Sequence, residues 1–326
     1  MAGKEPRQDV ASRLFLRPFL NFLGPFSIFY RQKYPFTRIS HTAGPMLRPI
    51  DFQSLDEALP VLVRGFPAAP RVFWESSLAR LKQYGATDPR ARTGYLLQAD
   101  GNDVGVILAI PSTREIGGQS CPVVNLSSWY IDERHRWRGP RMLQQVVSSA
   151  TTLYTDLTPT KPVRAMIGRF GFRNWTEGTL IFMLPLVALK AAKNAHVFPL
   201  HKLPSDTFTS SIRRMLDDHA ALGCIAAGLW DGDSLHPLIF SRTKRAGVPI
   251  ARLIYAQSRA LVIAHLGAIA RFLLREKLLL MAMNADAQDR VAGSFFTDWP
   301  APAFLKGKVT PPQCDLAYCE YVFLKI

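Results

Sequence analysis

The sequence has few cysteines, a deficit of acidic residues and no long uninterrupted apolar run. Its 326 residues contain four cysteines, which form no C-x-x-C pair and no Cys/His cluster with zinc-ligand spacing: Cys121, Cys224, Cys314 and Cys319. This spacing argues against a disulfide scaffold and a structural zinc site. We therefore expect free thiols, no bound metal and a reducing compartment such as the cytoplasm.

Basic residues exceed acidic ones by 40 to 25, which gives a net charge of +15. Such a surplus favours an anionic partner, such as a phosphorylated cofactor, nucleic acid or an anionic membrane surface. The densest basic cluster spans residues 134–141, and one concentrated cluster indicates a local anion site better than a long nucleic-acid track. Arginines in a solvated loop are the alternative explanation of the same cluster.

Residues 1–43 form a basic, aromatic-rich segment whose apolar part, residues 14–30, is interrupted by Arg17, Pro18 and Pro25. The stretch is too short for a membrane-spanning helix and does not follow the pattern of a secretory signal. Two interpretations stay open. The segment packs its phenylalanines against the globular body, or it makes a peripheral contact with an anionic membrane.

The first half of the remaining chain shows a mixed pattern of strands and helices. We predict strands over residues 46–51, 93–99, 104–111, 122–131 and 154–158, helices over 54–66, 72–84, from 140 onward and over 159–171, and a strand or hairpin over 172–184. Ser54 is the expected N-cap of its helix, and Asp100-Gly101-Asn102 is a strong hairpin turn. This pattern predicts a mixed α/β sheet.

The second half repeats this order without repeating the sequence. Residues 189–204 are the expected linker, followed by helices over 207–222 and 258–277 and strands over 224–230, 235–242, 249–256, 278–283 and 318–324. With about 150 residues per domain, the chain has room for two α/β domains, which we expect over residues 44–188 and 205–326.

The segment 132–141 lies between a predicted strand and a predicted helix. A loop that leads into a helix N-terminus presents unpaired backbone N–H groups and the positive end of the helix dipole. Gly139 permits close approach of the backbone to a ligand, and the arginines add charge-assisted contacts. The segment therefore predicts a diphosphate-binding site.

Over residues 44–188 the sequence resembles the GNAT family, the CoA-dependent N-acyltransferases. Arg136 and Gly139 match the first and fourth positions of the family's diphosphate loop, (Gln/Arg)-x-x-Gly-x-(Gly/Ala), and Gly171-Phe172 matches its later Gly-Phe landmark. The resemblance implies two GNAT-like mixed-sheet domains in tandem, the second a degenerate copy without such a loop. It further implies that acetyl-CoA or another acyl-CoA is bound by Ile131, Arg136, Trp137, Arg138, Gly139 and Arg141.

The sequence departs from the family pattern at three positions. Pro140 removes a backbone N–H, Arg141 stands where a small residue is usual, and Ile167 takes the place of a tyrosine that often serves as general acid. Arg141 is equally able to add a phosphate contact. These departures leave a second hypothesis open, in which the GNAT-like fold has lost catalysis and works as a binding or scaffolding protein.

The resemblance implies direct transfer of an acyl group from a CoA thioester to an amine of unidentified structure, small molecule or peptide. An ammonium group cannot attack, so the site needs a base, for which Asp132 and Glu133 are the candidates. Tyr130 and Ser128 are candidate acids or substrate contacts. Each has a structural alternative, since acidic residues in a basic loop form surface ion pairs and tyrosines pack into cores. A specific nucleic-acid partner is not expected.

Overall fold

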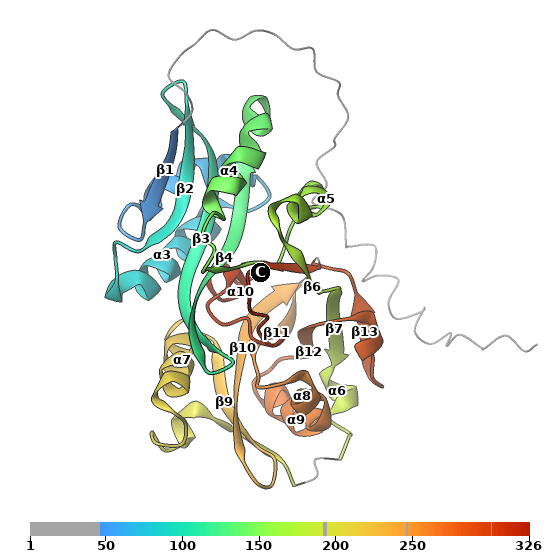
Figure 1. Ribbon diagram of the computed structural model, residues 1–326. Helices are drawn as coiled ribbons and strands as arrows, with labels where there is room; N and C mark the ends of the chain where they lie inside the picture. The colour runs from blue at the N-terminus through green and yellow to red at the C-terminus, as the bar shows by residue number, and fades with distance from the viewer. Residues whose placement is uncertain (1–45, 192–193, 246, 301) are drawn as a thin grey trace, which may run out of the picture. The chain divides into compact units, whose positions relative to one another are not determined.

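The structure, a computed structural model, describes residues 46–326 apart from 192–193, 246 and 301. These residues form two seven-stranded mixed sheets (Figure 1). The N-terminal segment 1–43, with the apolar stretch expected to pack or to contact a membrane, lies outside the described residues. Within the described part of the chain, no helix has the length and apolar character needed to cross a bilayer.

The first sheet contains the predicted antiparallel meander. Its strands, from edge to edge, are β1 (Met46–Asp51), β2 (Arg92–Ala99), β3 (Asn102–Ile116), β4 (Gln119–Ile131), β5 (Leu153–Asp156), β14 (Ala303–Lys306) and β6 (Arg173–Thr176). The turn between β2 and β3 is confirmed, with positive φ at Asp100 and Gly101. Only β4 and β5 run parallel in this sheet.

The helices of the first half cover opposite faces of this sheet. They are α2 (Leu59–Gly65), α3 (Arg71–Tyr84), α4 (Gly139–Val146) and α5 (Lys161–Ile167). Buried residues of α2 and α3 belong to one core and those of α4 to another. Ser54 occupies the predicted N-cap position, before the 3₁₀ turn Leu55–Ala58, but its hydroxyl donates to the carboxylate of Asp51 at 2.7 Å and makes no cap bond.

The second sheet has the strand order β13 (Ser294–Thr297), β7 (Gly178–Met183), β12 (Leu280–Ala285), β11 (Val248–Tyr255), β10 (Leu235–Arg245), β9 (Ile225–Trp230) and β8 (His196–Pro199). Its helices are α6 (Leu184–Val187), α7 (Ser210–Ala221), α8 (Arg259–Ala264) and α9 (Leu266–Arg275). The long helix expected over residues 258–277 is broken at His265, whose backbone leaves the helical region.

The boundary between the sheets does not coincide with the expected linker. The hairpin expected over residues 172–184 is divided, because β6 joins the first sheet and β7 the second. Strand β14, late in the chain, returns to the first sheet between β5 and β6. Residues 189–204 contain β8, which pairs with β9. The two sheets therefore exchange strands across the expected boundary.

The predicted last strand over residues 318–324 is wrong. This stretch forms a turn and the short helix α10 (Glu320–Phe323), and all four residues of α10 are buried. The segment contributes to one core that also contains residues of both sheets, such as Leu108 of β3 and Ile239 of β10. Packing between the sheets, rather than strand pairing, buries the apolar side chains of this segment. The C-terminus lies at the centre of Figure 1.

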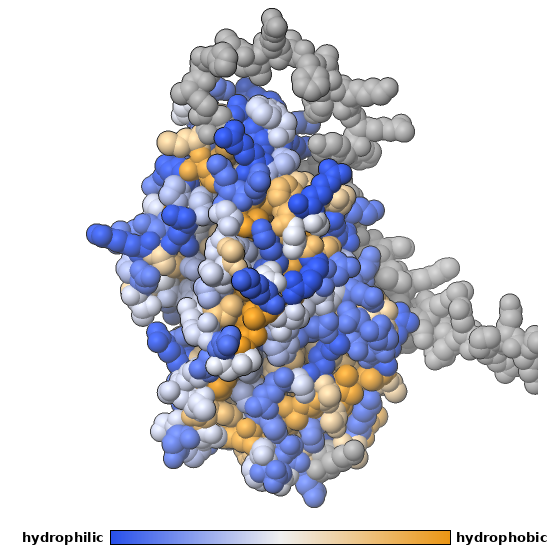
Figure 2. Space-filling model, viewed as in Figure 1, coloured by the Kyte–Doolittle hydropathy of each residue, from blue (hydrophilic) through white to orange (hydrophobic). Residues whose placement is uncertain are grey.

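Most of the large apolar side chains of the described residues are buried in these cores. On the face drawn in Figure 2, hydrophilic residues prevail and apolar ones appear as separate small patches. Among the exposed large hydrophobic side chains is Trp137, which is 67% exposed and lies in the basic cluster.

Candidate functional site

Strand β4 extends beyond the end of its parallel neighbour β5 in the middle of the first sheet. Its parallel pairing with β5 ends at Leu126, opposite Asp156, although β4 continues to Ile131 along β3. Between these points β4 carries a bulge, since Ser127 pairs with Leu108 but Tyr130 already pairs with Val106. Over residues 127–131 the backbone of β4 therefore has no strand partner on the side of β5 among the described residues, and we call this break in the pairing the opening.

Ser128 occupies the bulge with a φ of +52°. A residue other than glycine in this left-handed region costs of order 1–3 kcal/mol, which the surrounding structure must compensate. Bulges are also common beside active sites, where they redirect a side chain. The bulge makes this point of β4 a candidate for function.

A carboxylate from the C-terminal segment lies at the point where the strands separate. The Glu320 side chain accepts a hydrogen bond from Ser127 Oγ at 2.5 Å and another from Thr158 Oγ1 at 2.9 Å. The backbone N–H of Glu320 donates to Asn125 Oδ1 at 2.8 Å. Glu320 is therefore held from both sides. Ser127 and Asn125 of β4 bind it on one side, and Thr158, just after the end of β5, binds it on the other.

The environment of Glu320 raises the pKa of its side chain to about 7. Burial is the main cause, because the residue is only 1% exposed, while the hydrogen bonds from Ser127 and Thr158 oppose the shift. Burial and the nearby Glu320 together raise the pKa of Asp156 well above its ordinary value. Glu320 thus combines a fixed position with a pKa suited to exchange a proton at neutral pH.

A chain of hydroxyl groups connects Glu320 to the bulge. Ser127 Oγ lies 2.5 Å from Glu320 Oε2 and 3.2 Å from Ser128 Oγ. Ser127 is buried, whereas Ser128 is half-buried. We call these three residues the Ser128–Ser127–Glu320 chain. Hydroxyl groups both donate and accept, so the chain is able to pass a proton from the opening to the buried carboxylate.

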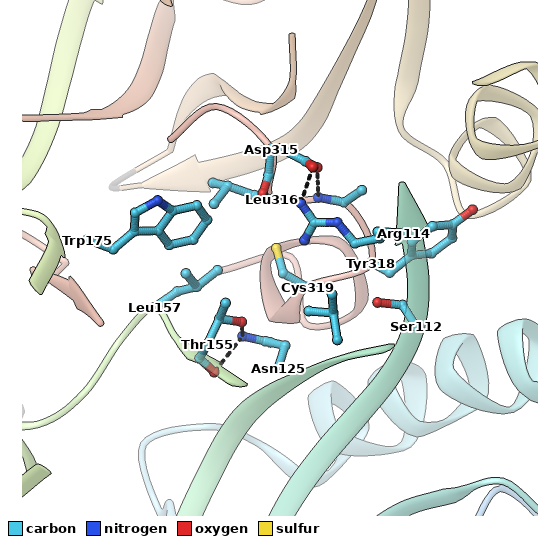
Figure 3. A pocket seen from close by; sticks show the side chains of 12 residues that line it. Ser112, Arg114, Asn125, Thr155, Leu157, Trp175, Asp315, Leu316, Tyr318 and Cys319 are labelled. Carbon is cyan, nitrogen blue, oxygen red and sulfur yellow. Dashed lines mark hydrogen bonds and ion pairs between the residues drawn. The ribbon is translucent and has the colours of Figure 1, made fainter. Parts of the chain in front are cut away.

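A buried ion pair fixes the C-terminal segment against the first sheet. Arg114 of β3 donates to the backbone oxygen of Asp315 at 2.6 Å and also pairs with its carboxylate, and both side chains are at most 7% exposed. Figure 3 shows this pair beside Cys319 and Tyr318, with the Asn125–Thr155 hydrogen bond below them. The crevice that these residues line is too narrow to hold a water molecule.

The segment 132–141 is a 3₁₀ turn, Glu133–Arg138, that runs directly into α4. Two of its amides already have partners, since His135 donates to the oxygen of Asp132 at 2.8 Å and Gly139 to that of Arg136. Gly139 is buried, and a Cβ on it would lie 3.2 Å from the ring of Trp129. The glycine therefore permits close packing of α4 on β4.

The arginine side chains of this segment are better placed to bind an anion than its backbone amides are. Arg138 stacks over Trp137 at 4.4 Å. The Nε of Arg138 and the Nε1 of Trp129 are both buried and have no hydrogen-bond partner among the described residues. Both donors are able to bind an acceptor such as a phosphate oxygen, and eight further buried side-chain atoms of the described residues also lack a partner. Arg136 and Arg141 are accessible, and Ile131 is buried beneath the segment.

The acidic residues predicted as bases have other contacts. Arg64 of α2 holds Asp132 through two hydrogen bonds, from Nε at 3.0 Å and from Nη2 at 3.2 Å. Glu133 is an exposed carboxylate whose nearest cation, Arg136, is 3.9 Å away. Asp132 is therefore better explained as the partner of Arg64 in a surface ion pair than as a catalytic base.

Tyr130 and Ile167 are both placed by packing. A Cβ on Gly65 would lie 2.4 Å from the ring of Tyr130, so the tyrosine packs directly on α2. Burial and the neighbouring Asp132 raise the pKa of the Tyr130 hydroxyl. Ile167, at the position where the family often has a tyrosine, is fully buried in the core beneath α4.

The second sheet has a corresponding parallel pair, β11 and β12, but no corresponding loop. Pairing extends from Ile250 to Arg252, and the helix that follows, α8, begins at Arg259 with Ser258 as its N-cap. The hydroxyl of Ser258 accepts the N–H of Leu261, so this helix N-terminus is capped by its own chain.

Sequence reasoning did not identify Glu320. A signal was present, because Glu320 is the only charged residue between Asp315 and Lys325 in an otherwise apolar stretch. A charged side chain in such a stretch is seldom buried without partners. Its partners Ser127 and Thr158 lie more than 150 residues earlier, and no local pattern connects them.

No family model matches the chain, and no curated protein matches its sequence. Solved structures do match. The GCN5-related N-acetyltransferase of Anabaena variabilis is 12% identical with a TM-score of 0.52, over 80% of this chain and 72% of that one. The chain has the GNAT fold. Its two seven-stranded mixed sheets correspond to the tandem arrangement expected from the sequence.

Other proteins with the GNAT fold align over similar lengths. A GCN5-related N-acetyltransferase from Kribbella flavida is 12% identical with a TM-score of 0.50, over 80% of this chain and 70% of that one. A protein from Enterococcus faecalis described as a probable N-acyltransferase is 10% identical with a TM-score of 0.52, over 84% and 74%. At these identities the likeness concerns the fold alone.

Proposed function

We propose that the chain is an N-acyltransferase that moves an acyl group, acetyl in the simplest case, from a CoA thioester to an amine by direct attack. The GNAT fold supports the reaction class. The observation that carries the proposal is the Ser128–Ser127–Glu320 chain, which brings a carboxylate with a pKa of about 7 to the opening between β4 and β5.

An amine acceptor is protonated at neutral pH and must lose a proton before it attacks. Glu320 accepts this proton, and the hydroxyl of Ser127 transmits it because it already donates to the carboxylate. Thr158 holds the second carboxylate oxygen, so the acceptor atom keeps a fixed position. A bound acyl-CoA would supply the electrophilic thioester carbonyl and the thiolate leaving group.

The CoA diphosphate would be held by guanidinium groups rather than by amides. Arg136 and Arg138 precede α4, and Arg138 has a buried donor without a partner. Arg141 adds a third positive charge on α4, and the exposed Trp137 offers a face for the adenine. The sequence predicts contacts from both these arginines and the amides around Gly139, and we propose that the arginines carry most of the contact.

Binding and turnover are tested separately. Acetyl-CoA is expected to raise the melting temperature of the full chain, and Arg138→Glu to abolish the shift, whereas Arg169→Glu, a charge reversal on the first half's surface, retains it. Turnover is followed by mass spectrometry of free CoA with a panel of amines. Binding without CoA release would support the alternative, a GNAT-like binding or scaffolding protein, and absence of both would contradict the proposal.

A further inference from the structure

A groove of about 380 Å³ lies between β8 and α9 on the second half of the chain, away from the Ser128–Ser127–Glu320 chain. Its size falls within the range of ligand-binding clefts. Its apolar lining comes from Ala195 and Val197 on the β8 side and from Ala268 and Phe272 of α9.

The groove follows the edge of the sheet. All four residues of β8, His196–Pro199, line it. Successive side chains of a strand point to opposite faces, so a groove on one face would be lined by alternate residues only. A groove lined by four consecutive residues is reached by the backbone of the strand.

Strand β8 is the end strand of the second sheet, and β9 is its only strand partner among the described residues. The free edge of such a strand presents backbone N–H and C=O groups that accept another strand. A cleft bounded by an edge strand and a helix is one of the arrangements that bind extended peptides by strand addition.

The charges around the groove favour an acidic ligand. Lys202 and Arg275 are exposed at its rim, and Arg271 also lines the groove and donates to the backbone oxygens of Ala188 and Lys190. The acidic residue of the lining, Glu276, is paired with Arg242. The rim therefore keeps a net positive charge.

We propose that this groove binds an extended acidic segment of a partner protein, which adds to β8 as a further strand. Main-chain hydrogen bonds to β8 supply the pairing, apolar side chains of the segment rest on Phe272, and its carboxylates contact Lys202 and Arg275. The chain's own residues 1–45 carry seven basic and two acidic side chains, so their charge does not match the groove.

The test uses the full chain and a fluorescein-labelled octapeptide of alternating Glu and Val, at about 0.15 M salt so that distant charges are screened. The control octapeptide alternates Glu and Pro, which keeps the charge, removes the N–H of every second residue and holds φ of these residues outside the range of a regular strand. We expect saturable binding of the first peptide by fluorescence polarisation, at least about tenfold weaker binding of the second, and slower hydrogen exchange at the amides of residues 196–198.

Variants separate this groove from the general basic surface. Lys202→Glu with Arg275→Glu is expected to weaken binding at least about tenfold, whereas Arg90→Glu with Lys161→Glu, an equal charge change at exposed positions of the first half, leaves it nearly unchanged. Equal binding of the two peptides, equal losses in the two double variants, protection confined to other residues, or no binding at about millimolar peptide would each overturn the proposal.

Discussion

Replacing Glu320 by glutamine is expected to remove a pH dependence from the stability of the protein. The side chain is 1% exposed, and its pKa is about 7 instead of 4.5. The folded protein therefore holds this proton more tightly than the unfolded chain does. The contribution of Glu320 to the free energy of unfolding is greatest below about pH 4.5, falls as the pH rises towards 7, and is lost above that.

The size of the effect follows from the two pKa values. The difference between 4.5 and about 7 corresponds to about 3 kcal/mol in the free energy of unfolding, most of it lost between pH 5 and 8. Glutamine keeps the shape and accepts the hydrogen bond from Ser127 without ionising. It also removes the charge that helps to raise the pKa of Asp156.

Urea unfolding followed by tryptophan fluorescence at pH 5 and pH 8 measures the effect. The natural protein is expected to lose about 2–3 kcal/mol more than Glu320→Gln between these pH values. Glu75→Gln, on an exposed face of α3, serves as the matched control and should follow the natural protein. Equal pH dependence in the natural protein and Glu320→Gln would refute the placement of a buried, titrating carboxyl group at the opening.

Three further substitutions test the packing around the site. Arg114→Met leaves Asp315 buried without its partner and should lower the free energy of unfolding by about 3–5 kcal/mol, whereas adding Asp315→Leu should recover much of the loss in the same urea assay. Gly65→Ala places a methyl group 2.4 Å from the ring of Tyr130 and should cost about 1–3 kcal/mol, and combination with Tyr130→Ala should cost less than the two single changes together. Ser258→Ala removes the cap of α8 and should lower the melting temperature by an amount equivalent to about 1 kcal/mol, while Thr209→Ala, at the N-cap of α7 where the side chain makes no cap bond, should not.

The sequence predicted the elements whose signals are local. The strands of the meander are apolar and rich in β-branched residues, and Asp100-Gly101 between two of them adopts the positive φ angles that its composition predicts. The helix after Pro140 was found because proline is tolerated in a first turn and Met142, Leu143 and Val146 recur at helical spacing.

Elements that depend on distant partners were missed. Strand β14 has four residues and pairs with strands more than 120 residues earlier, so no turn and no alternation of apolar and polar residues in the nearby sequence indicates it. The stretch 316–324 is apolar and aromatic, a composition that fits a buried strand and a buried irregular segment equally well. Its true position between the sheets also explains why Glu320, rather than Asp132 or Glu133, reaches the opening.

The rate of CoA release by Glu320→Gln, compared across pH with the natural protein and Glu75→Gln, tests the proposed chemistry most directly. General base catalysis contributes about 10²–10⁴-fold, so Glu320→Gln should be at least about a hundredfold slower. The natural protein should lose rate as the pH falls below about 7, where Glu320 becomes protonated. An unchanged rate and pH profile in Glu320→Gln would contradict its role as the proton acceptor.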